Sequence, residues 1–209
     1  MTPIEIAFST DGILAKAIDG FSPRQAQTDM AIEVAYAIDK KSSLIVEAGT
    51  GTGKTFAYLI PALLSDKKII VSTGTKNLQE QLFHKDLPLI RKALASNAQM
   101  ALLKGRANYL CRYRLDQFQE TRGQLDAETL TDLVKVKTWS NSTQSGDIGE
   151  LVSVQENSAI FPFVTSTVDN CLAKDCPDYD NCYLIKARKK AIEADLVVVN
   201  HHLFFADMA

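Results

Sequence analysis

The chain has 209 residues, 46% of them hydrophobic, and a formal net charge of −2. This length accommodates one α/β core and a small second module, and the total charge gives no sign of nucleic-acid binding. No apolar run approaches the roughly 18 residues of a membrane-spanning helix, so no membrane partner is expected. Residues 1–10 contain Glu5 and no basic residue, which argues against a secretory signal and for a cytoplasmic protein.

The first hundred residues predict alternating helices and strands. A helix is expected over 22–39, with Ser22 as N-cap, Pro23 in the first turn and Gln25 completing a capping box. Residues 44–47 predict a short buried strand that leads into a glycine-rich turn.

The alternation continues beyond this turn. A second helix is expected to begin near Gly53, followed by a strand over 68–72, a helix over 76–93 and a strand over 100–103. The second helix is expected to carry the apolar residues Phe56, Leu59, Ile60, Leu63 and Leu64. The residues expected to face inward on the helix over 76–93 are Leu78, Leu82 and Phe83. Such alternation is typical of a parallel α/β sheet.

The rhythm breaks after residue 103. The segment 104–193 shows no strand–helix alternation, its part from 140 to 158 is rich in Ser, Asn, Gly and Thr, and it holds all four cysteines. Residues 196–200 again predict a buried strand. The simplest organisation is one α/β domain, 1–103 and 194–209, interrupted by a cysteine-bearing insertion over 104–193.

Residues 48–55 read Ala-Gly-Thr-Gly-Thr-Gly-Lys-Thr, a phosphate-binding pattern with alanine in place of its first glycine. Glycines let the backbone approach phosphates, and the following helix adds its positive end. Lys54 is expected to reach the β- and γ-phosphates of ATP or GTP, and Thr55 to coordinate Mg²⁺. A glycine-rich turn without a ligand is the alternative, which the flanking strand and helix disfavour. The expected nucleotide-binding residues here are Ala48, Gly49, Thr50, Gly51, Thr52, Gly53, Lys54 and Thr55.

The carboxylate pair that hydrolysis requires is not visible. A phosphate-loop enzyme needs an acidic residue at the end of a strand to hold Mg²⁺, yet no Asp-Glu pair occurs in the chain. Asp195 and Asp207 flank the last predicted strand without matching that context. We therefore expect the chain to stop before the strand that carries the pair.

The cysteines Cys111, Cys171, Cys176 and Cys182 predict a metal or cluster site, because a reducing cytosol disfavours disulfides. Zinc accepts four thiolates, but zinc pairs are usually separated by two to four residues, and five residues separate Cys176 from Cys182. Zinc, disulfides and buried structural cysteines stay open as alternatives to an iron–sulfur cluster.

Five segments in order resemble the helicases of superfamily 2. Residues 21–27, Phe-Ser-Pro-Arg-Gln-Ala-Gln, resemble the adenine-recognition segment; residues 47–55 resemble motif I; and residues 71–82 resemble motif Ia. Residues 104–111, together with the spacing of the last three cysteines, look like the iron–sulfur domain of DinG/XPD-like helicases. Residues 199–203, Val-Asn-His-His-Leu, look like the segment before the DEAH box, and the sequence is most similar to the bacterial YoaA branch of this family.

The resemblance implies a RecA-like phosphate-loop domain, present in part, with an inserted and mainly helical iron–sulfur domain. It implies an ATP-dependent DNA helicase that moves 5′ to 3′ on single-stranded or forked DNA as a monomer, with ATP, Mg²⁺ and a [4Fe–4S] cluster as cofactors. The DEAH box, the arch insertion and the second RecA-like domain of the family are absent. The chain alone is therefore expected to bind nucleotide weakly without turnover.

The resemblance also implies roles for individual residues. Gln27 would bind adenine with support from Arg24, and the four cysteines would ligate the cluster. The residues expected at single-stranded DNA are Thr73, Thr75 and Gln79; an ordinary role in capping and on a helix surface is the alternative for them.

Basic and aromatic residues beside the cysteines suggest a second DNA contact. Arg112 and Arg114, with Lys186 and Arg188, could follow the phosphate backbone, with Tyr109, Tyr113 or Tyr183 as stacking surfaces. A solvated helix face is the alternative for such charge runs. His84, His201 and His202 are not expected to bind metal.

Two other functions remain open at this point. A small phosphate-loop kinase or other NTPase explains residues 48–55 but not the cysteines or residues 71–82. A zinc-containing nucleic-acid-binding module explains the cysteines and basic residues but leaves the phosphate loop without a use.

Overall fold

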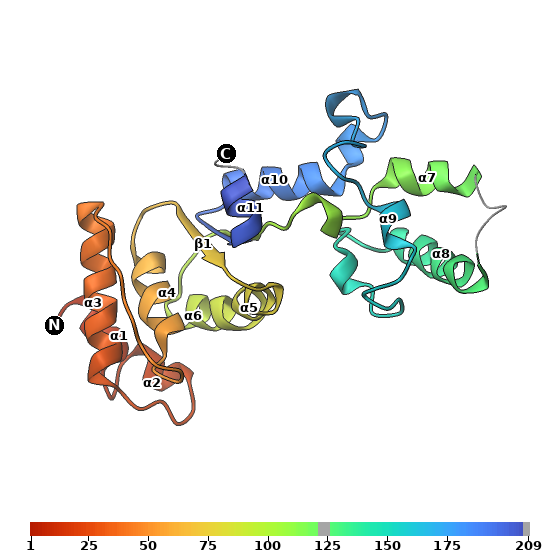
Figure 1. Cartoon of the computed structure of the whole chain (residues 1–209). Helices are drawn as coiled ribbons and strands as arrows, with labels where there is room; N and C mark the ends of the chain where they lie inside the picture. Colours follow the sequence, from red (N-terminus) through yellow and green to blue (C-terminus); the bar gives the residue numbers. More distant parts are fainter. Residues whose placement is uncertain (121–125, 207–209) are drawn as a thin grey trace. The chain divides into compact units, whose positions relative to one another are not determined.

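The computed structural model describes residues 1–120 and 126–206 of the chain (Figure 1). Asp207, considered above beside the last strand, lies outside the described residues. The chain forms two compact units. The sheet unit consists of Met1–Leu102 and Glu193–Ala209, and the insertion unit consists of Leu103–Ile192.

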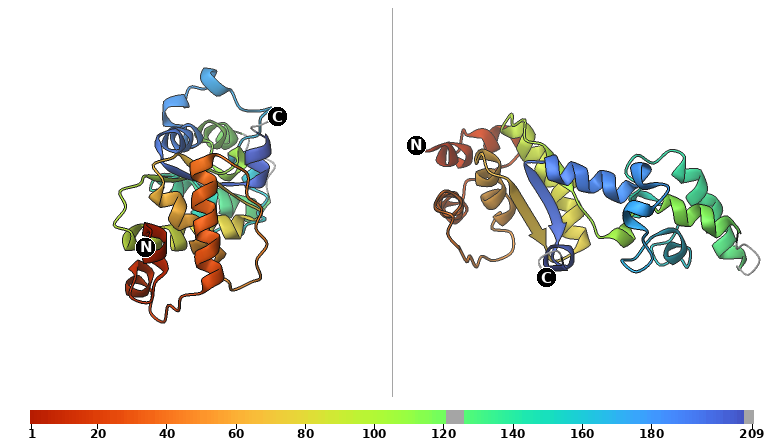
Figure 2. Two further views of the ribbon diagram at one scale, coloured as in Figure 1. Left: turned by 90° about the vertical axis from the view of Figure 1, so that its left-hand side faces the viewer. Right: turned by 90° about the horizontal axis from the view of Figure 1, so that it is seen from above.

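A three-stranded parallel sheet organises the sheet unit. Its strands are β1 (Ile69–Thr73), β2 (Met100–Leu102) and β3 (Leu196–Asn200), in the order β1-β3-β2. Ile69 pairs with Leu196 and Met100 pairs with Leu196 as well, so β3 is hydrogen-bonded on both sides. The right view of Figure 2 shows β1 beside β3. All five residues of β3 are buried. The predicted strands over 68–72, 100–103 and 196–200 are confirmed to within one residue at their ends.

The predicted strand over 44–47 is wrong. Residues 43–49 have no regular secondary structure, and Leu44, Ile45 and Val46 are exposed, Ile45 by 97%. An apolar run forms a buried strand only where another strand pairs with it, and none of the described residues pairs with this segment. The run instead leads, unpaired, into the glycine-rich turn.

Four helices precede or follow this turn: α1 (Pro3–Phe8), α2 (Ile13–Ala17), α3 (Gln25–Lys40) and α4 (Lys54–Leu64). The helix expected near Gly53 is confirmed as α4. The predicted capping box at Ser22 is wrong, because residues 21–24 have no regular secondary structure and α3 begins only after Arg24, whose side chain makes no cap bond. A capping box is present instead at α1, where Thr2 and Glu5 bond each other's backbone.

The helix predicted over 76–93 is continuous but contains one wider turn. It consists of α5 (Lys76–Gln81), the π-helical segment η1 (Leu82–Asp86) and α6 (Leu87–Ala93). Leu82 is buried and Phe83 half-buried as expected, but Leu78 is exposed. Gln79 takes the inward position instead, because its Nε2 donates a hydrogen bond to the Val198 carbonyl of the sheet at 3.3 Å.

The core of the sheet unit is aliphatic. The buried side chains come from the first helices, α4, the 76–93 helix and β3; they include Phe8, Leu14, Ala57, Leu59, Ile60, Leu82, Leu87, Ile90, Leu196 and Val198. The short helix α11 (His201–Ala206) follows β3. The expected parallel α/β fold, present in part, is therefore confirmed.

The insertion unit is mainly helical, as predicted. Its elements are η2 (Arg106–Asn108), α7 (Arg112–Glu120), α8 (Ala127–Ser140), η4 (Ile148–Glu150), α9 (Phe161–Val164), η5 (Ala173–Asp175), η6 (Tyr179–Asn181) and α10 (Tyr183–Glu193), whose last residue belongs to the sheet unit. It has its own apolar core, built from residues that include Tyr109, Leu110, Leu133, Val136, Ile160 and Val164. Across the ranges that the structure describes, no helix has the length and apolar character needed to cross a membrane.

Candidate nucleotide-binding and cysteine sites

The glycine-rich turn has the backbone of a phosphate-binding loop. Gly51 and Gly53 adopt φ angles of 76° and 80°, a left-handed conformation that favours glycine. A Cβ atom at Gly53 would lie 2.0 Å from Gln27 Nε2, so glycine is also required there by space. No atom lies within 4 Å of the Cβ position at Gly49 or Gly51, so the loop is open enough to receive a ligand.

Lys54 is the first residue of α4, and its ammonium group lies against the loop. Lys54 Nζ donates hydrogen bonds to the carbonyls of Ala48 and Gly49, at 2.7 and 2.6 Å. The Thr52 hydroxyl donates to the Gly49 carbonyl at 2.9 Å. A cation held at the loop by carbonyl acceptors is placed to exchange them for phosphate oxygens, which bind an ammonium more strongly.

Two side chains from the start of α3 also reach the loop. Arg24 Nη1 donates a short hydrogen bond to the Gly51 carbonyl, and Gln27 Nε2 donates to the Gly53 carbonyl at 2.9 Å. Gln27 is buried although it is polar. The extended residues before α3 thus bring Arg24 and Gln27 together with the loop, and adenine binding by them stays a prediction.

Thr55, the expected Mg²⁺ ligand, has a neighbour that the sequence reasoning missed. Tyr58 lies one helical turn after it on α4. Burial raises the pKa of Tyr58, the nearby Thr55 hydroxyl opposes this rise, and the negative charge of Asp86 adds to it. The sequence could have indicated Tyr58, because residues three apart on a helix share one face. No feature of the sequence indicated Asp86.

The three residues expected at DNA are engaged within the chain. Thr73 is buried and its hydroxyl lies 3.2 Å from the Thr75 carbonyl, and Gln79 is fully buried against the sheet. Thr75 is exposed, and its hydroxyl accepts the Leu78 N–H as the N-cap of α5. Contact of these side chains with DNA stays a prediction.

Two of the three histidines make polar contacts with neighbouring side chains. That the histidines do not bind metal stays a prediction. His84 lies 3.2 Å from the Glu80 carboxylate on an exposed helix face. His201 begins α11, and its Nδ1 lies 2.7 Å from the Ser72 hydroxyl.

All four cysteines line one cavity of about 220 Å³ in the insertion unit. Cys111 precedes α7, whereas Cys171, Cys176 and Cys182 belong to the loop and short helices before α10. Each is half-buried and none forms a disulfide. The structure therefore brings together the four residues that the sequence predicted as ligands, although Cys111 lies far from the others along the chain.

The sulfur atoms in this cavity are in a polar setting. Burial raises the pKa of Cys111, and the three other cysteines raise it further, while the Arg114 N–H donates to its sulfur and lowers it. The Ala173 N–H donates to Cys171 Sγ at 3.4 Å. Ala173 has a φ of 48°, a conformation that costs energy in a residue with a side chain and recurs at functional sites.

The described residues contain no group of three or more His, Cys, Asp or Glu side chains that could hold a single metal ion. A zinc ion would need four sulfurs about 2.3 Å from one point. The cysteines line a common cavity without meeting at such a point.

The basic and aromatic residues beside the cysteines are mostly packed. Arg112 stacks over the Tyr183 ring, 4.8 Å from its centre, and Arg112 Nη2 donates to the Tyr183 hydroxyl at 2.5 Å. Arg114 Nη2 donates to the Pro162 carbonyl at 2.9 Å. Tyr109 and Tyr183 are buried, so they are not the exposed stacking surfaces that we expected.

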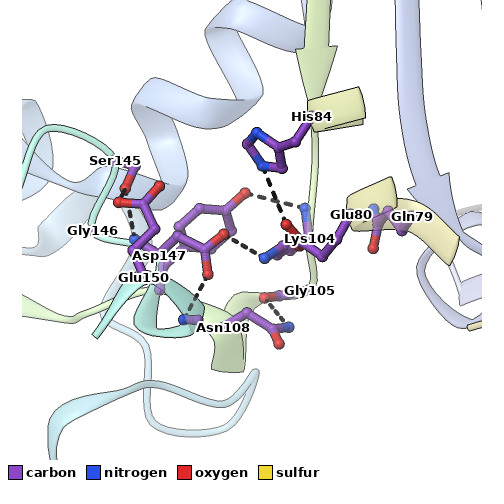
Figure 3. A network of polar contacts seen from close by, with 12 residues as sticks. Gln79, Glu80, His84, Lys104, Gly105, Asn108, Ser145, Gly146, Asp147 and Glu150 are labelled. Atoms are coloured by element: carbon purple, nitrogen blue, oxygen red, sulfur yellow. Dashed lines mark hydrogen bonds and ion pairs between the residues drawn. The ribbon is translucent and has the colours of Figure 1, made fainter. Parts of the chain in front are cut away.

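Other cations of this region differ in exposure. Lys186 and Arg188 are exposed on α10, and the cavity is lined by Arg106, Lys174 and Arg188. Lys104 is buried and forms an ion pair with Asp147 at 2.5 Å, both side chains being about 10% exposed (Figure 3). Lys104 therefore does not belong to a solvated basic face.

The sequence has clear relatives among known proteins. The DEAD/DEAH box helicase family matches residues 25–133, more than half of the chain. The chain is 57% identical to the "ATP-dependent DNA helicase YoaA" of Escherichia coli over 201 residues, which are 96% of this chain and 32% of that protein.

Two further relatives agree with this match. The YoaA protein of Haemophilus influenzae is 58% identical over 202 residues, 97% of this chain and 32% of that protein. The "ATP-dependent helicase DinG" of Mycobacterium tuberculosis is 35% identical over 227 residues, 97% of this chain and 34% of that protein. The chain thus spans about a third of the length of these relatives.

The resemblance to YoaA and DinG inferred from the motifs is confirmed by these matches. The family match covers the phosphate loop, α3 with Gln27, and the helix that begins after Thr75. The chain belongs to the DEAD/DEAH box helicase family.

Proposed function

We propose that the protein is an ATP-dependent DNA helicase that moves 5′ to 3′ on single-stranded or forked DNA and carries a [4Fe–4S] cluster. The observation that carries this proposal is the pairing of an open phosphate-binding loop with a separate cavity lined by four cysteines. The relatives' printed names, which describe ATP-dependent helicases, support the same activity.

ATP and Mg²⁺ fit the residues around the loop. The N–H groups of the loop and of the first turn of α4 would hold the phosphates, because the left-handed glycines turn the backbone around them. Lys54 would leave the carbonyls of Ala48 and Gly49 for phosphate oxygens, and Thr55 would offer its hydroxyl to Mg²⁺. Gln27 would bind the adenine base with support from Arg24. Both side chains already donate hydrogen bonds to backbone carbonyls of the loop.

The cysteine cavity fits an iron–sulfur cluster. Four half-buried thiols line a common space, and a four-iron cluster gives each cysteine a separate iron atom. The residues that would hold the cluster are Cys111, Cys171, Cys176 and Cys182.

DNA contacts are proposed on both units. Thr73, Thr75 and Gln79 lie at the end of β1 and the start of α5, where Thr75 is exposed. In the insertion unit, Arg112 and Arg114 follow the first cysteine, and exposed Lys186 and Arg188 add positive charge. Replacing exposed cations should lower the salt dependence of DNA binding. Each phosphate contact releases counterions from the DNA, so a protein that makes fewer contacts releases fewer of them.

The test uses the full-length protein and its Lys54→Ala variant. We expect the unaltered protein to hydrolyse ATP faster with single-stranded DNA and to displace a strand from a duplex with a 5′ tail but not from one with a 3′ tail. Lys54→Ala should abolish both activities. Hydrolysis that ignores DNA, or phosphoryl transfer to a small acceptor, would instead support the kinase or NTPase function.

The chain by itself should bind nucleotide without turning it over. The carboxylate that a phosphate loop needs for hydrolysis is not visible in its sequence. Turnover by the 209-residue chain that disappears in Lys54→Ala would contradict this expectation.

A further inference from the structure

The carboxyl ends of β1 and β3 meet at one edge of the sheet, because Thr73 pairs with Asn200 in a parallel ladder. In open parallel sheets, ligands bind outside the carboxyl ends of the strands. Helix α11 begins at this edge directly after β3, and the right view of Figure 2 shows it at the tips of both strands. The proposed DNA contacts Thr73 and Thr75 lie at the same edge, but the function proposed above gives α11 no role.

The first side chain of α11 is held in place by β1. His201 Nδ1 lies 2.7 Å from the Ser72 hydroxyl. The other ring nitrogen faces the loop after β1, because a Cβ atom placed on Gly74 would lie 3.7 Å from His201 Nε2. When the serine hydroxyl donates to Nδ1, the neutral ring carries its proton on Nε2, which is then a hydrogen-bond donor. A donor at this nitrogen suits an anionic acceptor such as a phosphate oxygen.

A large aromatic ring is exposed one helical turn further along α11. Phe205 is 61% exposed, and its ring centre lies 6.1 Å from that of His201. Residues four apart on a helix share one face, so the two rings belong to the same side of α11. An exposed phenylalanine ring offers a flat apolar surface of the kind on which the unpaired bases of single-stranded DNA stack.

The charge around the two rings fits a polyanion. Neither the segment 71–78 nor the segment 199–206 contains an acidic residue. Lys76 is exposed at the start of α5, next to the exposed Thr75. Carboxylates at this edge would repel a nucleic acid, whereas they need not disturb a protein that covers an apolar ring. The absence of acidic residues from these two segments therefore favours DNA as the partner of the two rings.

We propose that His201 and Phe205 form a further contact with single-stranded DNA. Phe205 is the stacking surface for one unpaired base, and His201 Nε2 donates a hydrogen bond to a neighbouring phosphate. Ser72 is a positioning residue, because it fixes the His201 ring through Nδ1. This inference rests on the proposed binding of single-stranded DNA and adds a site that recognises the flat face of a base, without preference for sequence.

The test measures the dissociation constants of the full-length protein for two strands of equal length, an oligothymidylate and an abasic deoxyribose-phosphate strand. The variants are His201→Ala, Phe205→Ala and Ser72→Ala. The matched controls are His84→Ala, at another exposed histidine, and Tyr36→Ala, at a ring that is 59% exposed. Thermal unfolding shows which variants are folded; if Phe205→Ala is not, Phe205→Leu carries the test, because leucine keeps apolar bulk without a flat ring.

We expect Phe205→Ala to weaken binding of the oligothymidylate at least about fivefold and to leave binding of the abasic strand unchanged, because only the oligothymidylate has bases to stack. His201→Ala should weaken binding of both strands about three- to tenfold, since it removes a phosphate contact. Ser72→Ala should weaken both to a smaller extent, and should have no effect when His201→Ala is already present. Both controls should bind like the unaltered protein.

Unchanged affinity for the oligothymidylate in the His201 and Phe205 variants would overturn the inference and leave the proposed function intact. Equal losses for both strands in Phe205→Ala would also overturn it, because an abasic strand has no base to stack. A lower melting temperature of Phe205→Ala with unchanged DNA affinity would show instead that the ring packs against another part of the protein. If the unaltered protein binds neither strand, the proposed function fails together with the inference.

Discussion

The sheet unit and the insertion unit bury their chains in different ways. In the sheet unit, β3 is paired on both sides and the core side chains are mainly aliphatic. The insertion unit has no strand among its described residues, and its short helices are joined by loops that bury charged side chains such as Lys104 and Asp147. The first unit depends on a repeated pattern, whereas the second depends on single polar contacts and on its cysteines.

Loss of a cysteine should have the largest effect and should be confined to the insertion unit. Cys111→Ser removes one proposed cluster ligand and the link between α7 and the loop that carries the other three. We expect limited proteolysis to cut the insertion unit rapidly while the chain still binds ADP. Ser166→Ala, a buried change at the same cavity, should leave the unit protected. Equal protection of the Cys111 variant would contradict a structural role for the site.

Removal of a buried charge should come next. Lys104→Met leaves Asp147 buried without its cation, which costs about 3–5 kcal/mol of unfolding free energy. Lys135→Met is the matched control, because Lys135 also pairs with an aspartate, Asp132, at 2.8 Å but is 40% exposed. That pair should contribute about 0–1 kcal/mol.

Trp139 is the only tryptophan of the chain and lies in the insertion unit. Its fluorescence during denaturation with urea therefore reports on this unit. Similar losses of stability in Lys104→Met and Lys135→Met would contradict the larger contribution expected of the buried ion pair.

In the sheet unit, the loop glycines should differ from one another. Gly53→Ala forces a side chain into a left-handed conformation, which costs about 1–2 kcal/mol, and places its Cβ against Gln27. Gly49→Ala meets no atom within 4 Å and should cost less. Thermal unfolding followed by circular dichroism compares them; equal melting temperatures would contradict the backbone argument.

The smallest effect should have the opposite sign. Burial raises the pKa of Asp86 above its usual value near 3.8, so the folded chain holds this proton more tightly than the unfolded chain. Stability is therefore lost as pH rises from that value through the raised pKa. Asp86→Asn should match or exceed the unaltered chain in stability at pH 7, with the advantage disappearing on acidification below pH 3.8. A clear loss of stability at pH 7 would contradict this.

The sequence predicted the parts of the fold that repeat. The apolar run 196–200 and the helix after Gly53 are buried by their own pattern, so β3 and α4 lie where they were expected. The run 44–47 is also rich in aliphatic residues but stays unpaired among the described residues, because burial of a strand also depends on a neighbour that its own sequence does not encode.

Single polar contacts decided the places where prediction failed. The bond from Gln79 to Val198 turns an amide inward in place of Leu78. Arg24 is the extended N-cap of α3 and bonds to the Gly51 carbonyl, whereas a helix capped at Ser22 was expected. For the cysteines, the sequence supplied the residue types and the resemblance their role, but only the fold brings Cys111 to the other three.

The most direct test of the account is the iron, sulfide and zinc content of the anaerobically purified chain, together with its visible absorption spectrum. We predict about four iron and four sulfide per chain and a broad absorption band that dithionite bleaches. About one zinc and no sulfide would contradict the account: the phosphate loop would remain, but the insertion unit would be a zinc module.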